Sequence, residues 1–287
     1  MTDPRPYTIE ALKLGPMDNF VYLIADRASA RAAVVDPAWD VPAVLARAAG
    51  LGLHITDALL THSHQDHING VGALLEATDA RVHLHRDEAA FWGAQLVRPA
   101  LHRGGDTLLL GSTPIEVLHT PGHTMESSCF LLKDETGKDV AVFTGDTLFI
   151  GDVGRPDLAQ KAGVITLEDL AGHLYHSLRT KIMTLPDDVI VYPGHGAGSA
   201  CGKKMSNETT STISAQKATN YALRANMTQS EFIKEVTEGL TPPPKYFPMN
   251  VRMNKQGYES FDTVMERAAQ SLSPAGFEEA VNATEAL

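Results

Sequence analysis

The stretch Thr61-His62-Ser63-His64-Gln65-Asp66-His67 places three imidazoles and a carboxylate within a few residues, and the chain is organised around it. The short apolar run before it, Ala58-Leu59-Leu60, predicts a buried strand, and the residues from Asn69 onward predict the start of a helix. The stretch therefore lies on a strand-to-helix turn, where open α/β sheets place their ligand sites. Imidazole and carboxylate at this spacing suit one or two ions of zinc, iron or manganese. The alternative is a polar loop that happens to contain histidines.

Composition limits the class of protein. The 287 residues are enough for one large domain or two modest ones, and 43% apolar residues permit a sizeable core. No apolar run reaches the ~18 residues of a membrane span, and residues 1–6 show no secretory signal. A net charge of −11 argues against a nucleic-acid partner. The two cysteines, Cys129 and Cys201, form no zinc-type pair or disulfide framework, so we expect a reducing, cytoplasmic setting.

Strands and helices are expected to alternate along most of the chain. Strand-like runs occupy 7–14, 20–24, 32–35, 58–60, 81–85, 107–110, 115–118, 128–132, 140–143 and 189–192, the first three as an antiparallel meander. Helices are expected at 41–50 with Asp40 as the N-cap, after 69, and at 87–95, 167–178, 206–225, 228–238, 260–272 and from 275 to 283. This order predicts a two-layer β-sandwich with helices on both outer faces.

Three more ligand candidates follow predicted strands, each directly after a glycine. They are His123 in Pro121-Gly122-His123, Asp146 in Thr144-Gly145-Asp146, and His195 in Pro193-Gly194-His195. Glycine lets the backbone turn tightly and approach a site closely. Together with the histidine cluster, these turns are strong evidence for a metal centre.

The set His62, His64, Asp66, His67, His123, Asp146 and His195 resembles the metallo-β-lactamase superfamily over at least residues 7–200. The resemblance implies an α/β (α+β) fold, the αββα sandwich with its metal site at one edge. In the dinuclear hydrolases of that superfamily, one metal takes the residues matching His62, His64 and His123. The other takes those matching Asp66, His67 and His195, and the carboxylate matching Asp146 bridges the two metals.

Three further segments, 151–157, 194–206 and 246–250, are similar to persulfide dioxygenases, in particular to the branch fused to a rhodanese. That resemblance implies one Fe(II) per chain, held by His62, His123 and Asp146. This facial triad leaves positions open for O₂ and the substrate sulfur. His64, Asp66, His67 and His195 would then hydrogen-bond to the ligands and to water instead of holding a second metal.

The activity implied is oxidation of the terminal sulfur of glutathione persulfide, or of a related low-molecular-weight thiol persulfide, by O₂. The products would be sulfite and the free thiol, and the role would be sulfide detoxification. We expect a catalytic domain at 1–245 and a C-terminal helical extension at 246–287 that resembles the linker towards a rhodanese. The expected partners are the persulfide, O₂, a rhodanese in cis or in trans and further copies of the chain, with no membrane.

Arg155 is the first candidate for holding a substrate carboxylate, because a guanidinium can fork onto it. The alternative is an internal salt bridge with Asp152 or Asp157. Lys203, Lys204 and Arg252 are weaker candidates that could equally be solvated surface charges. Cys201 could relay sulfane sulfur, with Lys203 and Lys204 favouring its thiolate, or could be a small buried thiol. A structural role is expected for Cys129 and for the remaining histidines, at 54, 83, 85, 102, 119, 173 and 176.

Two other functions compete with the dioxygenase. One is a dinuclear zinc thioester hydrolase of the glyoxalase II kind, which would hold two zincs instead of one iron. The other is a non-catalytic metal-binding or sulfur-carrier module, which would turn over neither persulfide nor thioester.

Overall fold

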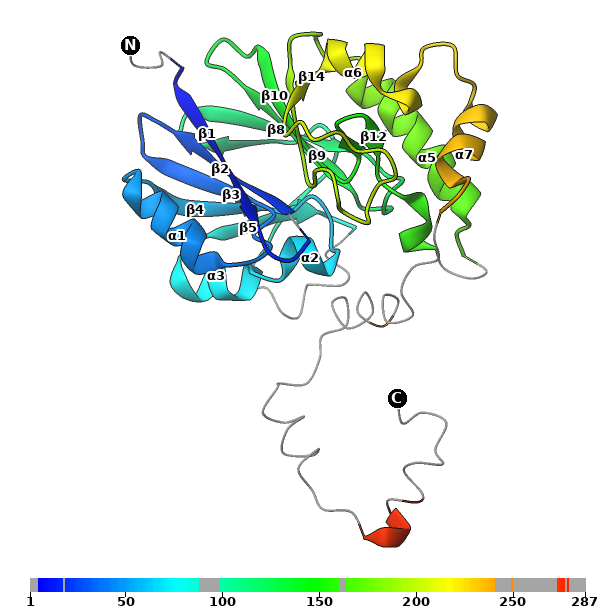
Figure 1. Cartoon of the computed structure of the whole chain (residues 1–287). Helices are drawn as coiled ribbons and strands as arrows, with labels where there is room; N and C mark the ends of the chain where they lie inside the picture. The colour runs from blue at the N-terminus through cyan, green and yellow to red at the C-terminus, as the bar shows by residue number, and fades with distance from the viewer. Residues whose placement is uncertain are drawn as a thin grey trace.

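Two six-stranded sheets stack face to face, and helices cover the outer face of each (Figure 1). This computed structural model describes residues 5–17, 19–87, 99–160, 164–240, 249, 273–276 and 278. The αββα sandwich expected from the sequence is confirmed. Within the described ranges, no helix is both long and apolar enough to cross a membrane.

The first sheet combines an antiparallel meander with a parallel half. Its strands, in spatial order, are β1 (Tyr7–Leu14), β2 (Asn19–Asp26), β3 (Arg31–Val35), β4 (His54–Leu59), β5 (Arg81–His85) and β6 (Ala100–His102). The pairs β1–β2 and β2–β3 are antiparallel, whereas β3 to β6 pair in parallel. The carboxyl ends of β3 and β4 therefore open at the same edge of the sheet.

The second sheet has the order β14-β13-β10-β9-β8-β7. Its strands are β7 (Thr107–Leu110), β8 (Thr113–His119), β9 (Ser128–Lys133), β10 (Asp139–Gly145), β13 (Ile190–Pro193) and β14 (Ser211–Thr212). Only β10 and β13 pair in parallel, so their carboxyl ends also share an edge. A small ribbon, β11 (Leu148–Phe149) with β12 (Asp152–Val153), follows β10.

Several helices begin where the sequence supplies a side-chain cap. They are α1 (Val41–Gly50), α2 (Gln65–Ile68), α3 (Val71–Ala77), η1 (Pro156–Ala159), α5 (Leu167–Ser177), η2 (Leu178–Ile182), α6 (Ile213–Thr219), η3 (Tyr221–Leu223) and α7 (Gln229–Thr237). The Asp40 carboxylate accepts from the Ala43 amide at the start of α1. The Thr228–Glu231 capping box predicted for α7 is present with both of its bonds.

Three apolar clusters hold the layers together. One lies between the first sheet and the helices α1 and α3, and another between the second sheet and α5, α6 and α7. The third fills the space between the sheets, where Leu59 meets Phe130 and Phe143, all fully or almost fully buried. The edges of both sheets are therefore held rigidly at the end where the ligand turns emerge.

One predicted helix is wrong. Residues 206–225 form β14, α6 and η3 instead of one long helix. Asn220 breaks the helix: its side-chain oxygen accepts from the Ala222 amide, and its Nδ2 donates to the backbone oxygen of Asp152 at 3.0 Å. The helix expected at 260–272 and almost all of that expected at 87–95 lie outside the described residues.

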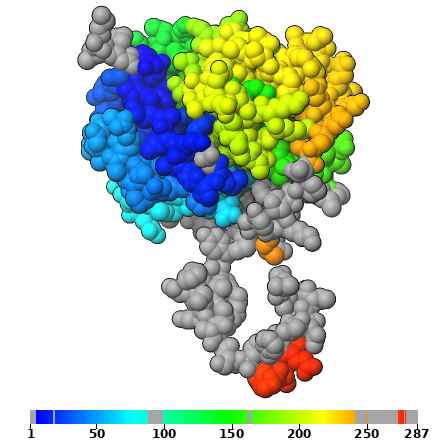
Figure 2. Space-filling view, in the orientation of Figure 1, coloured from blue at the N-terminus to red at the C-terminus, as the bar shows by residue number. Residues whose placement is uncertain are grey.

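The N-terminal strands meet the late part of the chain directly. The Phe20 amide donates to the Gly194 oxygen at 2.9 Å, and Asn19 forms an isolated β-bridge with His195. The Tyr22 hydroxyl donates to the Pro193 oxygen at 2.7 Å. Figure 2 shows the blue N-terminal strands bordering the yellow-green segment on one face. This seam places His195 beside the first sheet.

Asp26 ties the end of β2 to the β7–β8 turn. Its side chain accepts hydrogen bonds from Ser29, Ser112 and Thr113 at 2.6–3.1 Å. Burial alone would raise the pKa of Asp26, but these bonds outweigh it and hold the pKa well below its usual range.

We expect Asp26→Asn to lower the free energy of unfolding by about 1.5–3 kcal/mol at pH 7, the typical loss for hydrogen bonds to a charged group. Because the folded pKa is depressed, this stabilisation is present above the unfolded pKa of about 3.9 and disappears as the pH falls through the folded value. Urea unfolding of both proteins at pH 7 and pH 3 measures it. A stability gap that does not shrink at pH 3 would contradict the charge-based account.

Candidate metal centre

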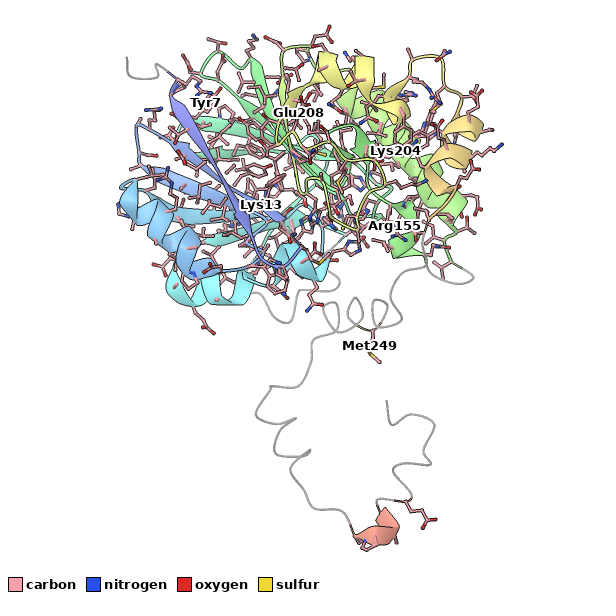
Figure 3. All side chains as sticks on the ribbon, in the orientation of Figure 1. Tyr7, Lys13, Arg155, Lys204, Glu208 and Met249 are labelled. Atoms are coloured by element: carbon pink, nitrogen blue, oxygen red, sulfur yellow. The ribbon has the colours of Figure 1, made fainter. Side chains whose placement is uncertain are left out.

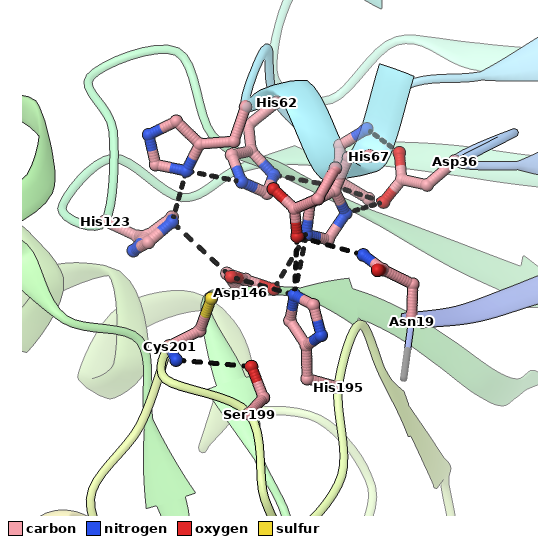
Figure 4. Close-up of polar contacts among 12 residues, drawn as sticks. Asn19, Asp36, His62, His67, His123, Asp146, His195, Ser199 and Cys201 are labelled. Carbon is pink, nitrogen blue, oxygen red and sulfur yellow. Dashed lines mark hydrogen bonds and ion pairs between the residues drawn. The ribbon is translucent and has the colours of Figure 1, made fainter. Parts of the chain in front are cut away.

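Four strands deliver polar side chains to one edge of the sandwich. His62 follows β4, Asp146 follows β10 and His195 follows β13, while His123 lies in the turn after β8. His64 is the N-cap of α2, and Asp66 and His67 lie on that helix instead of on an open turn. All seven predicted ligands are buried and lie together (Figure 4).

One triad consists of His62, His64 and His123. The Nδ1 atom of His64 lies 3.0 Å from the Nε2 atoms of both His62 and His123. The Nδ1–H of His123 donates to the Arg155 carbonyl at 2.8 Å, so a neutral His123 ring carries its lone pair on Nε2. One proton on His64 can satisfy only one of its two neighbours, whereas a cation among the three nitrogens would satisfy all of them.

The second triad consists of Asp66, His67 and His195. The His195 Nε2 atom lies 3.1 Å from both the His67 Nε2 atom and the Asp66 Oδ2 atom. Asp146 lies between the triads, with its oxygens 3.3 Å from His67, 3.5 Å from His123 and 3.7 Å from His195. This arrangement matches the two-site pattern implied by the superfamily, with Asp146 in the bridging place.

The side chains present fit a bound metal. Both carboxylate oxygens of Asp146 and the Nδ1 atom of His195 are buried without a hydrogen-bond partner. Such atoms are costly unless an ion or water satisfies them. Imidazole and carboxylate donors suit zinc, iron and manganese alike, so the donor set calls for a transition metal without selecting one.

The electrostatics favour the metal-binding protonation states of five of the ligands, but not of His67. Burial would lower the pKa of His67, but the carboxylates of Asp146 and Asp66 outweigh it and raise that pKa. Burial and the neighbouring His123 ring lower the pKa of His64 to about 3, and burial likewise lowers the pKa values of His62 and His123. Burial would raise the pKa of Asp66 and of Asp146, but the adjacent His67 and His195 rings outweigh it and lower both. Neutral imidazoles and ionised carboxylates are the forms that coordinate metals.

Asp36 is a functional residue that the sequence reasoning missed. It follows β3, and its Oδ2 atom accepts from the Nδ1 of His67 at 2.9 Å and from the Thr61 hydroxyl at 2.6 Å. Since Thr61 has one hydroxyl proton and gives it to Asp36, the His62 Nδ1 must donate to Thr61 across their 3.0 Å contact. Asp36 thus fixes the tautomers of His62 and His67 so that both Nε2 lone pairs face the centre.

Asn19 was also missed. Its Nδ2 donates to Asp66 Oδ2 at 3.0 Å, and the Trp39 indole donates to its Oδ1 at 3.2 Å, which fixes the orientation of the amide. No local pattern marks Asn19 or Asp36 as part of a site. Each is the polar residue beside a strand end, and only the pairing of strands brings it to the ligands.

Cys201 lies at the metal centre. Its sulfur belongs to a cluster with Asp66 and His195 in which the ligand atoms all lie within 4.8 Å, and Figure 4 shows it turned toward Asp146. Burial and the negative charges of Asp146 and Asp66 raise the pKa of its thiol. The expectation that Lys203 and Lys204 favour the thiolate is therefore wrong, while a role in sulfur relay stays a prediction.

The predicted substrate residues have protein partners. Arg155 forks onto Asp157, one of the internal ion pairs considered as its alternative, with contacts of 2.9 and 2.7 Å. Lys203 bonds to backbone oxygens at the end of α7, and the Lys204 ammonium lies 5.0 Å above the Tyr221 ring. Figure 3 labels Arg155 and Lys204 among the side chains. Arg252 lies outside the described residues. Substrate binding by these residues stays a prediction.

Four of the histidines expected to be structural interact with one another. His83 bonds to Asp57 at 2.8 Å and to His102 at 2.9 Å, and His85 stacks on His119 with ring centroids 3.9 Å apart. Cys129 is buried in the core, as expected.

The profile of the metallo-beta-lactamase superfamily matches residues 14–195, and the chain belongs to this superfamily. It is 31% identical over 244 residues to human mitochondrial persulfide dioxygenase ETHE1, covering 83% of this chain and 85% of that protein. It is 36% identical over 178 residues to a hydroxyacylglutathione hydrolase of Rhodopseudomonas palustris, covering 62% of each. The crystal structure of ETHE1 from Myxococcus xanthus superposes with a TM-score of 0.71 at 32% identity, covering 86% of this chain and 98% of that one.

We expect Asp36→Ala to weaken metal binding by roughly tenfold to a hundredfold, because losing an outer partner that orients a ligand histidine has that typical cost. Competition with a chromogenic chelator measures the affinity. Asp57→Asn is the matched control, since Asp57 is a buried carboxylate bonded to His83 and not to a ligand. Equal losses in the two variants would contradict the assignment.

Proposed function

We propose that this protein is a persulfide dioxygenase with one iron(II) ion, held by His62, His123 and Asp146. The observation that carries the proposal is the extent of the resemblance. The match to human ETHE1 covers 83% of the 287-residue chain, which is more than residues 1–195 make up. It therefore extends past His195, where the match to the superfamily profile ends. The hydrolase match covers only 62% of either chain.

The reaction proposed is RSSH + O₂ + H₂O → RSH + HSO₃⁻ + H⁺. The bond between the two sulfurs breaks, the terminal sulfur is oxidised, O₂ is reduced, and water supplies the third oxygen of the sulfite. An iron(II) ion supplies the redox chemistry and open positions for O₂ and sulfur. The protein supplies buried ligands with fixed tautomers, and a buried thiol at Cys201 that would relay sulfur.

The substrate proposed is glutathione persulfide or a related low-molecular-weight thiol persulfide. Residues 1–245 would form the catalytic domain, and 246–287 an extension towards a rhodanese supplied in cis or in trans. We further propose that the protein is cytoplasmic and homo-oligomeric.

A dinuclear zinc thioester hydrolase remains the second candidate, because both triads and the bridging carboxylate are assembled. The deciding experiment is oxygen uptake with glutathione persulfide by iron-loaded protein, beside hydrolysis of a glutathione thioester by zinc-loaded protein. We expect oxygen uptake only, with close to one iron per chain. Two zincs per chain with thioester turnover and no oxygen uptake would establish the hydrolase instead.

Variants of the two triads should differ in their iron content. His62→Ala should lose both iron and activity, because His62 is a proposed ligand. Asp66→Ala and His195→Ala should keep most of the iron and lose roughly tenfold to a hundredfold in turnover, the usual cost of losing a group that orients ligands and water. Elemental analysis and oxygen uptake measure this. Loss of a second, stoichiometric metal from the Asp66 variant would contradict the mononuclear assignment.

A further inference from the structure

The segment 154–157 lies between the metal ligands and the loop that carries Cys201. On one side, the Arg155 oxygen accepts from the Nδ1 of His123 at 2.8 Å. Gly154 is equally close, since a Cβ there would lie 1.8 Å from the Asp146 oxygen and 3.0 Å from His123. On the other side, the Arg155 amide donates to the Cys201 oxygen at 3.2 Å.

The guanidinium of Arg155 strengthens the same connection. Its Nε and Nη2 atoms donate to the two carboxylate oxygens of Asp157 at 2.9 and 2.7 Å. Its Nη1 atom donates to the Ala200 oxygen at 3.3 Å. Both side chains of the pair are only 7% exposed, so the fork is fixed in direction and poorly screened by solvent.

We infer that Arg155 and Asp157 are a positioning pair, which locks the Cys201 loop and the His123 ring in one relative arrangement. The main chain of Arg155 joins the Cys201 carbonyl to the His123 ring. The guanidinium of Arg155 joins the Ala200 carbonyl to Asp157. This role differs from anchoring a substrate carboxylate, because the Nε and Nη2 atoms of Arg155 already donate to the two carboxylate oxygens of Asp157.

The positioning pair therefore limits the access of reagents to the Cys201 thiol. Cys201 is only 6% exposed and lies beside Asp66 and His195. Its loop contacts Arg155 through the two consecutive carbonyls of Ala200 and Cys201. When the fork is lost, the Ala200 carbonyl loses its fixed donor and the loop keeps only the main-chain bond between the Arg155 amide and the Cys201 carbonyl. The loop can then lift the thiol away from the centre.

The test is alkylation of the native, as-purified protein by iodoacetamide, followed at each cysteine by mass spectrometry. In Arg155→Lys, which keeps the charge but loses the fork, we expect Cys201 to react roughly tenfold to a hundredfold faster, as for loss of a charge-assisted hydrogen bond. Cys129 is fully buried in the core and reports global opening. Its rate should not change.

Asp157→Asn should reproduce the effect, and the double variant should add little, because the two residues act as a unit. Arg224→Lys is the matched control, since Arg224 pairs with Glu235 at the exposed surface. Parallel acceleration at both cysteines, or an unchanged Cys201 rate in Arg155→Lys, would overturn the inference.

A kinetic measurement separates positioning from anchoring, and only this measurement rests on the proposed function. Positioning predicts a lower kcat for Arg155→Lys on charged and uncharged persulfides alike, with KM little changed. A KM increase confined to a persulfide with a carboxylate would overturn positioning in favour of anchoring. Absence of persulfide turnover in the wild type would refute the proposed function alone, because the alkylation result does not depend on the reaction.

Discussion

The sandwich holds nitrogen and oxygen lone pairs close together at one buried edge. The Nδ1 atom of His64 lies 3.0 Å from the Nε2 atoms of both His62 and His123. Both carboxylate oxygens of Asp146 are buried without a hydrogen-bond donor. A buried polar atom left unsatisfied costs about 1–3 kcal/mol, so this arrangement opposes folding until a cation binds. The closely packed core between the sheets is what holds such groups in place.

Neither sheet can build the centre alone. The first sheet supplies Asp36 and the stretch from His62 to His67, and the second supplies Asp146 and His195. The seam between β2 and β13 then brings Asn19 to Asp66 and next to His195. Because these contacts span the sandwich, the geometry of the ligands is a property of how the layers close and not of any one turn.

The clustering of the seven ligand candidates could be predicted from the sequence, because the signals that mark them are local. The spacing from His62 to His67 and the glycines before His123, Asp146 and His195 are readable in a few residues. The role of Asp36 could not be predicted, because it depends on the parallel pairing of β3 with β4, which brings Asp36 to Thr61, 25 residues further along the chain.

Long-range contacts also explain the errors. Asn220 sits in a segment without glycine or proline, which predicts continuous helix, yet its side chain is bonded to the backbone of Asp152. Lys203 and Lys204 are two and three residues from Cys201, but sequence proximity did not set the thiol's environment. The carboxylates Asp66 and Asp146, distant in sequence, raise the pKa of the thiol together with burial.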